Sequence, residues 1–384
     1  MKLLYLSTPS FADCDFPLIK SFQEKGVDVT YLILLPCFSL RSTLVDIKKQ
    51  IPRTEILLAT EYKEFKAYES YMDMSRVYVA NRTGKNALTI SYWKNKWNLY
   101  RFLKANKFDI IHCDYIVSKE FGFMFRMAKK WVQTIHDPFP HTGEKSKAKS
   151  DSYNVTIANS DLLVLLNAKQ HDKFCKYYSL PKGKVVVNRL GAYDNIKVFT
   201  DAKISPIGNN VLFFGRISPY KGIEYLCKAM IEVRKSIPDA TLTIAGGGKM
   251  YFDIKPYQQL GYINVINRYV GMQELAALLQ RAAISVCPYT DATQSGVIMT
   301  SYSLGKPVVA TNVGGLGEMV EDGKTGLLVP PKDVSALAGA ITALLSDTER
   351  LKYMSDYIIN SYYTGEKSWS SIADKYIEYY KKIL

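Results

Sequence analysis

Cysteine is scarce and unpatterned in this 384-residue chain. The six cysteines, at positions 14, 37, 113, 175, 227 and 287, form no Cys-x-x-Cys pair and keep no regular spacing. Most of them lie in apolar stretches, as Cys287 does in ISVCPY (284–289). This pattern excludes the usual zinc sites and predicts buried free thiols.

Long apolar runs are also missing. No stretch approaches the roughly 18–20 residues that a membrane span needs. The first residues, MKLLYLSTPS, make a poor signal peptide because their apolar stretch is short and Asp13 and Asp15 follow it. There is no internal repeat and no low-complexity tract. With 47% hydrophobic and 22% charged residues, the composition is typical of a globular protein, which we expect to be cytoplasmic and, at this length, to have two domains.

Positive charge is concentrated in the first half of the chain. Residues 1–200 carry 31 Lys and Arg against 19 Asp and Glu, a net of +12, whereas residues 201–384 carry 19 against 17, a net of +2. The excess favours an anionic partner: acidic lipid, a phosphorylated acceptor or nucleic acid. YWKNKWNLYRFLKANKF (92–108) interleaves aromatic and basic residues, which suits an anionic bilayer surface, although a solvated helix face is the alternative. No nucleic-acid-binding module is recognisable, so we do not expect nucleic acid.

Strand-like and helix-like segments alternate, and the alternation occurs twice. Such alternation predicts an α/β fold with parallel sheets covered by helices on both faces. The polar stretch 193–210 is interpreted as a linker between two such sheets, which leaves a cleft between the domains. The predicted strands of the first half are 2–7, 27–35, 108–115, 131–137 and 161–167, with helical stretches such as 16–26 and 118–130 between them; those of the second half begin near 211, 240, 262, 284, 307 and 326.

A loop with two cations follows the first strand of the second half. In VLFFGRISPYKG (211–222) the apolar strand ends at Gly215, and Arg216 and Lys221 stand on the short loop before the next helix. Ligands of open parallel sheets bind at the carboxyl ends of strands, beside helix N-termini. Arginine offers a fork and lysine a compact charge for phosphate oxygens, so the pair suits a diphosphate. Two solvated loop cations are the alternative interpretation.

A second polar loop precedes the helix near 296. Gln294, Ser295, Gly296 and Val297 lie between the strand end at CPY and this helix, where backbone N–H groups point off the helix N-terminus. VGG (313–315) is a further turn at the same edge. An ordinary strand-helix-strand unit accounts for the fold of this region, but not for three successive loops rich in glycine and polar residues.

Several segments of the chain resemble those of a known family. GRISPYKG (215–222), IEYLCKAM (223–230), AGGG (245–248) and GKPVVATNVGGLGEMVEDGKTGLLVPPKD (305–333) look like the group 1 (family 4) retaining glycosyltransferases with the two-Rossmann GT-B architecture. The first half is similar through QTIHDPFPHTGE (133–144) and VVVNRLGAYD (185–194), and SWSSIADKYIEYY (368–380) resembles the closing helix that crosses back onto the first domain. The resemblance implies an acceptor-binding domain at 1–198 with helix 366–384 packed on it, and a donor-binding domain at 199–365, facing each other across a cleft.

The resemblance also implies residue roles. Transfer of a sugar from a nucleotide-diphosphate donor, with retention and without a divalent metal or other cofactor, is the implied activity. His136 falls on the histidine that faces the donor sugar, and His141 and Glu144 on the same loop are candidates for acceptor contact; His112 and His171 receive no role. The donor residues so implied are Arg216 and Lys221 at the diphosphate, Gly215 and Gly222 at the turns, Tyr269 and Val270 near the base, and Asp291, Gln294, Ser295, Gly296, Val297 and Thr300 around the sugar and ribose.

One departure from the family pattern concerns two glutamates, eight positions apart, that the family usually carries. Alignment through GKPVVAT places Ala292 and Thr300 there, so both carboxylates are missing, and Asp291 is one residue away. The leading interpretation is a hexosyltransferase that acts on a lipid-linked saccharide acceptor in cell-surface polysaccharide or glycolipid synthesis. The alternatives are a nucleotide-sugar epimerase of the same architecture and a non-catalytic nucleotide-sugar-binding subunit.

Overall fold

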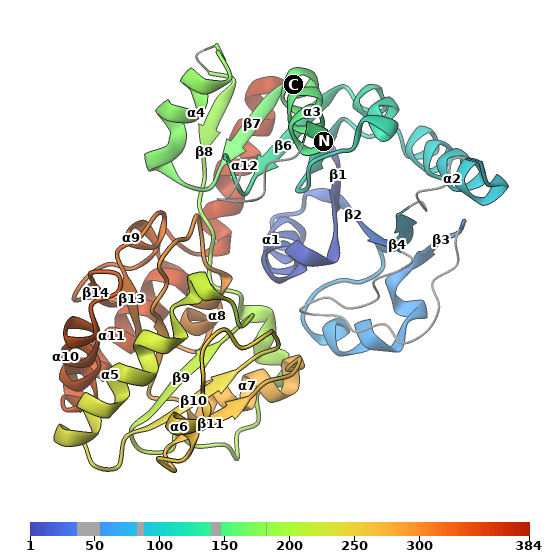
Figure 1. Cartoon of the computed structure of the whole chain (residues 1–384). Helices are drawn as coiled ribbons and strands as arrows, with labels where there is room; N and C mark the ends of the chain where they lie inside the picture. Colours follow the sequence, from blue (N-terminus) through green and yellow to red (C-terminus); the bar gives the residue numbers. More distant parts are fainter. Residues whose placement is uncertain (37–53, 83–87, 140–146, 182) are drawn as a thin grey trace. The chain divides into compact units, whose positions relative to one another are not determined.

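The computed structural model describes the whole chain except residues 37–53, 83–87, 140–146 and 182 (Figure 1). The chain divides into two compact units, Met1–Leu190 with Trp369–Leu384, and Gly191–Ser368. Each unit is built on its own mostly parallel β-sheet, which confirms the predicted α/β class.

The first unit contains an eight-stranded sheet in the order β3-β4-β2-β1-β5-β6-β7-β8. Neighbouring strands are parallel, except that β3 runs antiparallel to β4. The central strands are buried on both faces, which is why they read as nearly unbroken apolar runs. The strands are β1 (Lys2–Ser7), β2 (Asp28–Pro36), β3 (Ile56–Leu58), β4 (Val77–Arg82), β5 (Ile110–Cys113), β6 (Lys130–Ile135), β7 (Leu162–Leu165) and β8 (Val185–Val187).

Helices and short 3-10 segments connect these strands. The closing helix α12 (Trp369–Ile383) returns to this unit and packs on α1 (Ala12–Glu24), where Phe22 meets the ring of Tyr376 and Lys25 pairs with Asp374 at 2.7 Å. The remaining elements are α2 (Ile90–Asn106), α3 (Lys147–Asn159), α4 (His171–Tyr177), η1 (Pro9–Phe11), η2 (Ala59–Glu61), η3 (Lys63–Ser70), η4 (Lys119–Arg126) and η5 (Ala168–Gln170).

The second unit contains a six-stranded, fully parallel sheet in the order β11-β10-β9-β12-β13-β14. Counted within the unit, this is the 3-2-1-4-5-6 order of the Rossmann fold. The chain therefore starts in the middle, between β9 and β12, and winds outward in both directions. The strands are β9 (Asn210–Phe214), β10 (Thr241–Ala245), β11 (Ile263–Ile266), β12 (Ile284–Cys287), β13 (Val308–Thr311) and β14 (Gly326–Val329).

Amphipathic helices cover this second sheet. In α5 (Ile223–Ser236) the buried side chains Leu226, Met230 and Val233 recur at helical spacing. Two further helices begin at aspartate N-caps, where Asp333 and Asp347 each accept a backbone N–H at 2.9 Å. The other elements are α6 (Lys255–Gln258), α7 (Met272–Arg281), α8 (Gly296–Ser303), α9 (Leu316–Met319), α10 (Val334–Leu345), α11 (Thr348–Ile359), the 3-10 helices η6 (Asp194–Phe199) and η7 (Pro219–Lys221), and the π-helical turn η8 (Asn360–Thr364).

Two sequence-based expectations differ from the structure. The helical stretch expected at 118–130 is the 3-10 helix η4, after which β6 already begins at Lys130. The expected linker 193–210 is partly ordered, because η6 buries Ile196 in the same apolar cluster as α7. Because residues 193–210 are mostly polar, the sequence did not indicate that Ile196 would be buried.

The thiols and the helices agree with the expectations from composition. Cys14, Cys113, Cys227 and Cys287 are buried free thiols and Cys175 is half-buried, while Cys37 lies outside the described residues. Within the described part of the chain, every helix is too short or too polar to span a bilayer.

Candidate functional site

The predicted diphosphate loop lies at the topological switch point of the second sheet. Arg216 and Lys221 follow β9, and the polar loop 288–295 follows β12, the strand beside it from which the order reverses. Ligands of doubly wound sheets bind at this position, outside the carboxyl ends of the strands. The two loops are joined by a backbone hydrogen bond from Thr290 to the Tyr220 carbonyl at 2.8 Å.

Lys221 occupies an aromatic and largely buried environment. Its Nζ lies 3.7 Å from the ring centre of Tyr289 and 5.1 Å from that of Tyr220. Burial lowers the pKa of this ammonium, and the neighbouring Tyr220 partly offsets the effect. Among the described residues no carboxylate forms an ion pair with Lys221, so its charge is held mainly by the faces of two rings.

Arg216 is the exposed member of the pair. Its Nη2 lies 3.4 Å from the Tyr220 hydroxyl, a long contact that leaves the guanidinium largely in solvent. The two cations together lower the pKa of Tyr220, although its burial acts in the opposite direction. This loop therefore combines one buried and one exposed positive charge around a single tyrosine.

Glycines allow the loops at this edge to lie backbone against backbone. Gly222 has φ +65°, and a Cβ there would come within 2.0 Å of the Pro288 carbonyl oxygen. Gly246 has φ +148°, and a Cβ there would come equally close to the Gly215 carbonyl. Gly314 stands in the same relation to Ala292. One glycine in each of GRISPYKG, AGGG and VGG, namely Gly222, Gly246 and Gly314, is thus required by close approach between loops.

The start of α8 carries the predicted sugar and ribose residues. Ser295 is buried, its amide points to Met319 Sδ at 3.4 Å, and its hydroxyl lies 3.2 Å from that of Tyr289. Gly296 and Val297 follow as the first helical residues. Thr300 Oγ donates to the Gly296 carbonyl at 2.8 Å, so its hydrogen is used within the helix.

Three further predicted positions lie on other parts of this edge. Asp291 is exposed, and Gln294 is half-buried. Tyr269 is 38% exposed and, with Val270, precedes α7; its backbone carbonyl accepts from Arg268 at 3.2 Å. The described structure thus gathers the predicted donor residues on the loops following β9, β11 and β12 of one sheet.

Lys306, in the GKP motif, has a structural explanation. Its Nζ donates to the carbonyls of Gln280 and Ala282, at 3.3 and 2.7 Å, at the carboxyl end of α7. A cation there satisfies carbonyls left open at a helix end and complements the helix dipole. This lysine anchors α7 rather than the donor loops.

In the first unit, His136 directly follows β6 and pairs with Asp114, which follows β5. Asp114 Oδ2 lies 2.9 Å from His136 Nε2, and the two side chains are 2% and 15% exposed. The imidazole stacks on Phe11, with ring centres 4.0 Å apart and planes 12° apart. The switch point of this sheet lies between β1 and β5, so the loop carrying Phe11 and the Asp114 loop flank it.

A second carboxyl group, Asp15, reaches Asp114 from α1. Burial, together with the charge of Asp114, raises the pKa of Asp15 well above its usual range. Burial also opposes ionisation of Asp114, but His136 lowers the pKa of this carboxyl overall. Asp114 Oδ1 is buried without a hydrogen-bond partner among the described groups, and the raised pKa of Asp15 favours the protonated form of that neighbouring carboxyl group.

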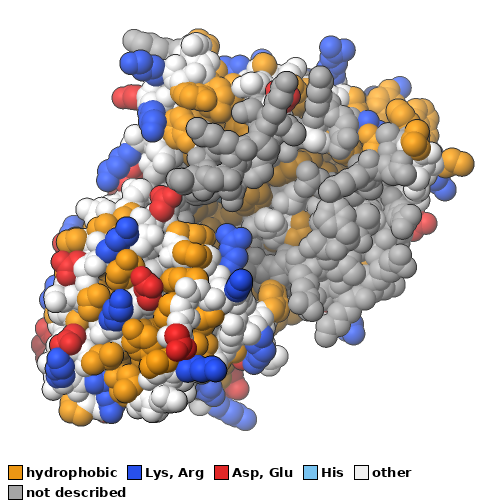
Figure 2. Space-filling view, viewed as in Figure 1, with side chains coloured by type: hydrophobic (Ala, Val, Ile, Leu, Met, Phe, Trp, Pro, Cys, Tyr) orange, Lys and Arg blue, Asp and Glu red, His pale blue; other side chains and the backbone are white. Residues whose placement is uncertain are grey.

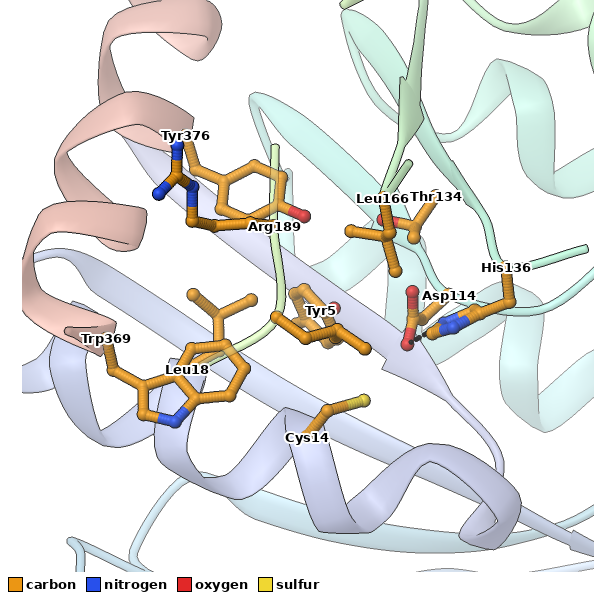
Figure 3. A pocket seen from close by; sticks show the side chains of 11 residues that line it. Tyr5, Cys14, Leu18, Asp114, Thr134, His136, Leu166, Arg189, Trp369 and Tyr376 are labelled. Atoms are coloured by element: carbon orange, nitrogen blue, oxygen red, sulfur yellow. Dashed lines mark hydrogen bonds and ion pairs between the residues drawn. The ribbon is translucent and has the colours of Figure 1, made fainter. Parts of the chain in front are cut away.

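These groups border a small pocket within the first unit (Figure 3). Its lining includes Tyr5, Cys14, Asp114, His136, Arg189 and Trp369. Cys14, Asp114 and His136 place three potential metal-ligand atoms within 4.8 Å of one another. However, the Cys14 thiol donates to the Phe11 carbonyl at 3.0 Å, and the other two groups bind each other, so the described donors are satisfied without an ion.

Two of the other three histidines, His112 and His171, lie in the described part of the chain. His112 is fully buried between Tyr380 and Thr134, and burial lowers its pKa to about 4, in keeping with a structural residue. His171 lies on the surface beside Asp172. His141 and Glu144, predicted to contact an acceptor, lie outside the described residues.

Comparison with known proteins relates the second unit to a family. Residues 208–347 match the family described as Glycosyl transferases group 1. Glycogen synthase of Mycobacterium tuberculosis is 30% identical over 225 residues, which are 56% of this chain and 54% of that protein, so the chain spans about half the length of this relative. D-inositol 3-phosphate glycosyltransferase of Corynebacterium aurimucosum is 27% identical over 298 residues, 69% of this chain and 70% of that protein.

Among solved structures, HepE of Anabaena, in complex with UDP and glucose, has a TM-score of 0.68 at 18% identity and covers the full length of both chains. Sucrose-phosphate synthase of Thermosynechococcus elongatus has a TM-score of 0.65 at 18% identity, over 100% of this chain and 99% of that one. Residues 208–347, most of the second unit, match the group 1 glycosyltransferases. The fold of the chain is the GT-B fold of these neighbours.

Sequence reasoning about this chain missed four residues of its candidate sites. Asp114 directly follows the buried strand β5, a position at a sheet edge that could have marked it. Asp15 lies inside α1 and looks like an ordinary helical aspartate. Phe11 and Tyr289 are apolar residues whose roles depend on which ring or charge faces them, and no sequence pattern carries that information.

Proposed function

We propose that this group 1 glycosyltransferase moves a hexosyl unit from a nucleotide-diphosphate sugar to a lipid-linked saccharide acceptor, with retention, in the cytoplasm during synthesis of a cell-surface polysaccharide or glycolipid. The observation that carries the proposal is the pair of cations at the switch point of the second sheet. Lys221 is buried without a described carboxylate partner, and a diphosphate would supply the missing negative charge. The bound UDP of HepE is consistent with such a donor.

The chemistry follows from where charge develops. As the bond between the anomeric carbon and the diphosphate oxygen breaks, negative charge grows on the leaving group, and Arg216 and Lys221 stabilise it. The acceptor hydroxyl attacks the same face of an oxocarbenium-like carbon, and its proton passes to the departing phosphate oxygen. No divalent metal and no cofactor is needed in this scheme, because fixed side-chain cations supply the electrostatic stabilisation.

The other donor contacts are assigned with this scheme. The α8 start contributes the backbone N–H groups of Gly296 and Val297, since that of Ser295 is directed at Met319. With Thr300 committed to the Gly296 carbonyl, its hydroxyl can only accept from a ribose hydroxyl. His136 positions the sugar, and Tyr269 and Val270 hold the base through their backbone.

Transfer is tested with isotope-labelled UDP-, GDP- and ADP-sugars, each with and without a lipid-linked saccharide acceptor. We expect label in the acceptor for one nucleotide class, an axial or equatorial linkage that matches the donor anomer by proton NMR, and unchanged rates in EDTA. Label that moves only to an epimeric nucleotide sugar would indicate an epimerase. Binding without any conversion of the label would indicate a non-catalytic subunit.

We further propose that the first unit attaches to an anionic membrane surface through α2. Ile90, Trp93 and Trp97 share one face of this helix and are 86%, 60% and 58% exposed. Lys94, Arg101 and Lys104 lie on the same exposed side, and Figure 2 shows hydrophobic and basic side chains together in this region at the upper right. Large exposed apolar side chains flanked by bases suit the headgroup region of an anionic bilayer.

The α2 surface predicts lipid-dependent sedimentation. At low salt the protein should sediment with phosphatidylglycerol vesicles several-fold more than with phosphatidylcholine vesicles. The double variant Trp93→Ala/Trp97→Ala should lose most of this binding, because it removes the apolar anchors while leaving the bases in place. Tyr353→Ala, which removes an aromatic side chain 55% exposed in the second unit, serves as the matched control. Equal sedimentation with both kinds of vesicle would contradict the attachment.

A further inference from the structure

The His136 imidazole is held from two directions in the first unit. Asp114 Oδ2 lies 2.9 Å from its Nε2, and Phe11 stacks on its face at 4.0 Å. An ionised carboxylate can only accept a hydrogen bond, so Nε2 must carry the hydrogen and the Nδ1 edge is turned the other way. Figure 3 shows the Asp114 carboxylate and the His136 ring next to each other in the lining of the pocket, with a dashed line between them.

Asp114 is itself fixed by a buried chain of hydrogen-bonding groups. Burial and the charge of Asp114 raise the pKa of Asp15, and Asp15 Oδ2 accepts from the Tyr31 hydroxyl at 2.9 Å. Tyr31, Asp15 and Asp114 are at most 2% exposed. Their side chains therefore cannot turn into solvent. Together with His136 they form a chain of four neighbouring side chains that connects β2, α1 and the ends of β5 and β6.

We propose that Asp114 is the positioning residue of His136: it fixes the ring orientation and keeps the hydrogen on Nε2, so that the Nδ1 edge is presented to the sugar. The inference rests on the proposed function, because it gives His136 a substrate-facing role. Asp114 acts through His136 and is not itself in contact with substrate. Because the His136 ring is already fixed before the substrate binds, it loses no further conformational entropy on reaching the transition state.

Several charged and titratable groups face this pair and must be considered in any pH study. Burial lowers the pKa of His136, but the charge of Asp114 outweighs it and the pKa is raised overall. Asp137 contributes in the same direction from the adjacent position. The other groups that face the pair are Tyr5 on β1, Cys14 and Asp15 on α1, Tyr31 on β2, His112 on β5, and Tyr376 and Tyr380 on α12.

The experiment compares Asp114→Asn with one control variant. Asparagine keeps the shape but removes the charge, and its amide group can donate to Nε2, which moves the imidazole hydrogen to Nδ1. Asp172→Asn is the matched control, because Asp172 also pairs with a histidine, His171, at 2.9 Å but on the surface. The chain has four histidines, so their nitrogen and ring-proton NMR signals can be assigned individually.

We expect Asp114→Asn to lower the pKa of His136, to populate its Nδ1–H form and to reduce kcat/KM about 100-fold. The limb of the kcat/KM profile that reports His136 should move to lower pH, because without the carboxylate the ring loses its proton earlier. Asp172→Asn should keep the His136 pKa and tautomer, with kcat/KM within severalfold of the wild type.

Two results would overturn the inference. One is wild-type tautomer, pKa and kcat/KM in Asp114→Asn. The other is a loss of activity with the His136 tautomer and pH profile unchanged, which would show that Asp114 serves only stability. Failure of the wild type to transfer any sugar would instead contradict the proposed function, and the NMR titration would still decide whether Asp114 controls His136.

Discussion

Lys221→Met is expected to lower kcat/KM for sugar transfer by about 100- to 1000-fold, as does removal of one stabilising donor from other active sites. Methionine retains the aliphatic stem that packs on the Tyr289 and Tyr220 rings but removes the ammonium. Because burial already disfavours the charge on Lys221, the thermal stability of the unliganded protein should not fall. Activity and stability are thus predicted to separate. Arg216→Ala, on the exposed side of the same loop, should show a similar loss of activity.

Steady-state kinetics and calorimetry on the same preparations check this prediction. Lys228→Met is the matched control, because Lys228 is an exposed lysine on α5 of the same unit. Among UDP, GDP and ADP, the nucleotide that most raises the melting temperature of the wild type should stabilise Lys221→Met and Arg216→Ala less, but the control to the same extent. Wild-type turnover in either loop variant would remove the diphosphate assignment, whatever the effect on the fold.

Gly222→Ala is expected to destabilise the second unit by at least about 3 kcal/mol, far more than a glycine substitution in open space. The added Cβ would lie 2.0 Å from the Pro288 carbonyl oxygen, so the loops after β9 and β12 must move apart. The positive φ of +65° adds backbone strain of about 1–2 kcal/mol. Since both loops form the candidate donor site, transfer should be lost along with stability.

Gly261→Ala separates the two contributions. Gly261 also has a positive φ, +79°, but a Cβ there meets nothing within 4 Å. Calorimetry should therefore show a fall in melting temperature of about 2–8 °C for Gly261→Ala and of at least about 6–12 °C for Gly222→Ala. Equal shifts in the two variants would mean that the close approach at Pro288 is absent.

The amino-acid sequence determined the fold class and the position of the candidate donor loops at the carboxyl edge of the second sheet. Continuous apolar runs at regular intervals are produced by parallel strands buried on both faces, so β1, β9 and β12 could be predicted locally. Arg216 and Lys221 could be assigned because they follow such a strand, and connections in these sheets place every such loop at one edge. The motifs that resemble the family are local in the same sense, since each is one strand, one turn and one helix start.

Tertiary structure alone decided how those residues are used. The sequence gives no sign that Lys221 lies on two tyrosine rings, or that the charge of Asp114 raises the pKa of Asp15. These relations join segments up to about a hundred residues apart, and each depends on which strands are neighbours. Burial and partner geometry set the charge and the direction of a side chain, and they exist only once the sheets have been assembled.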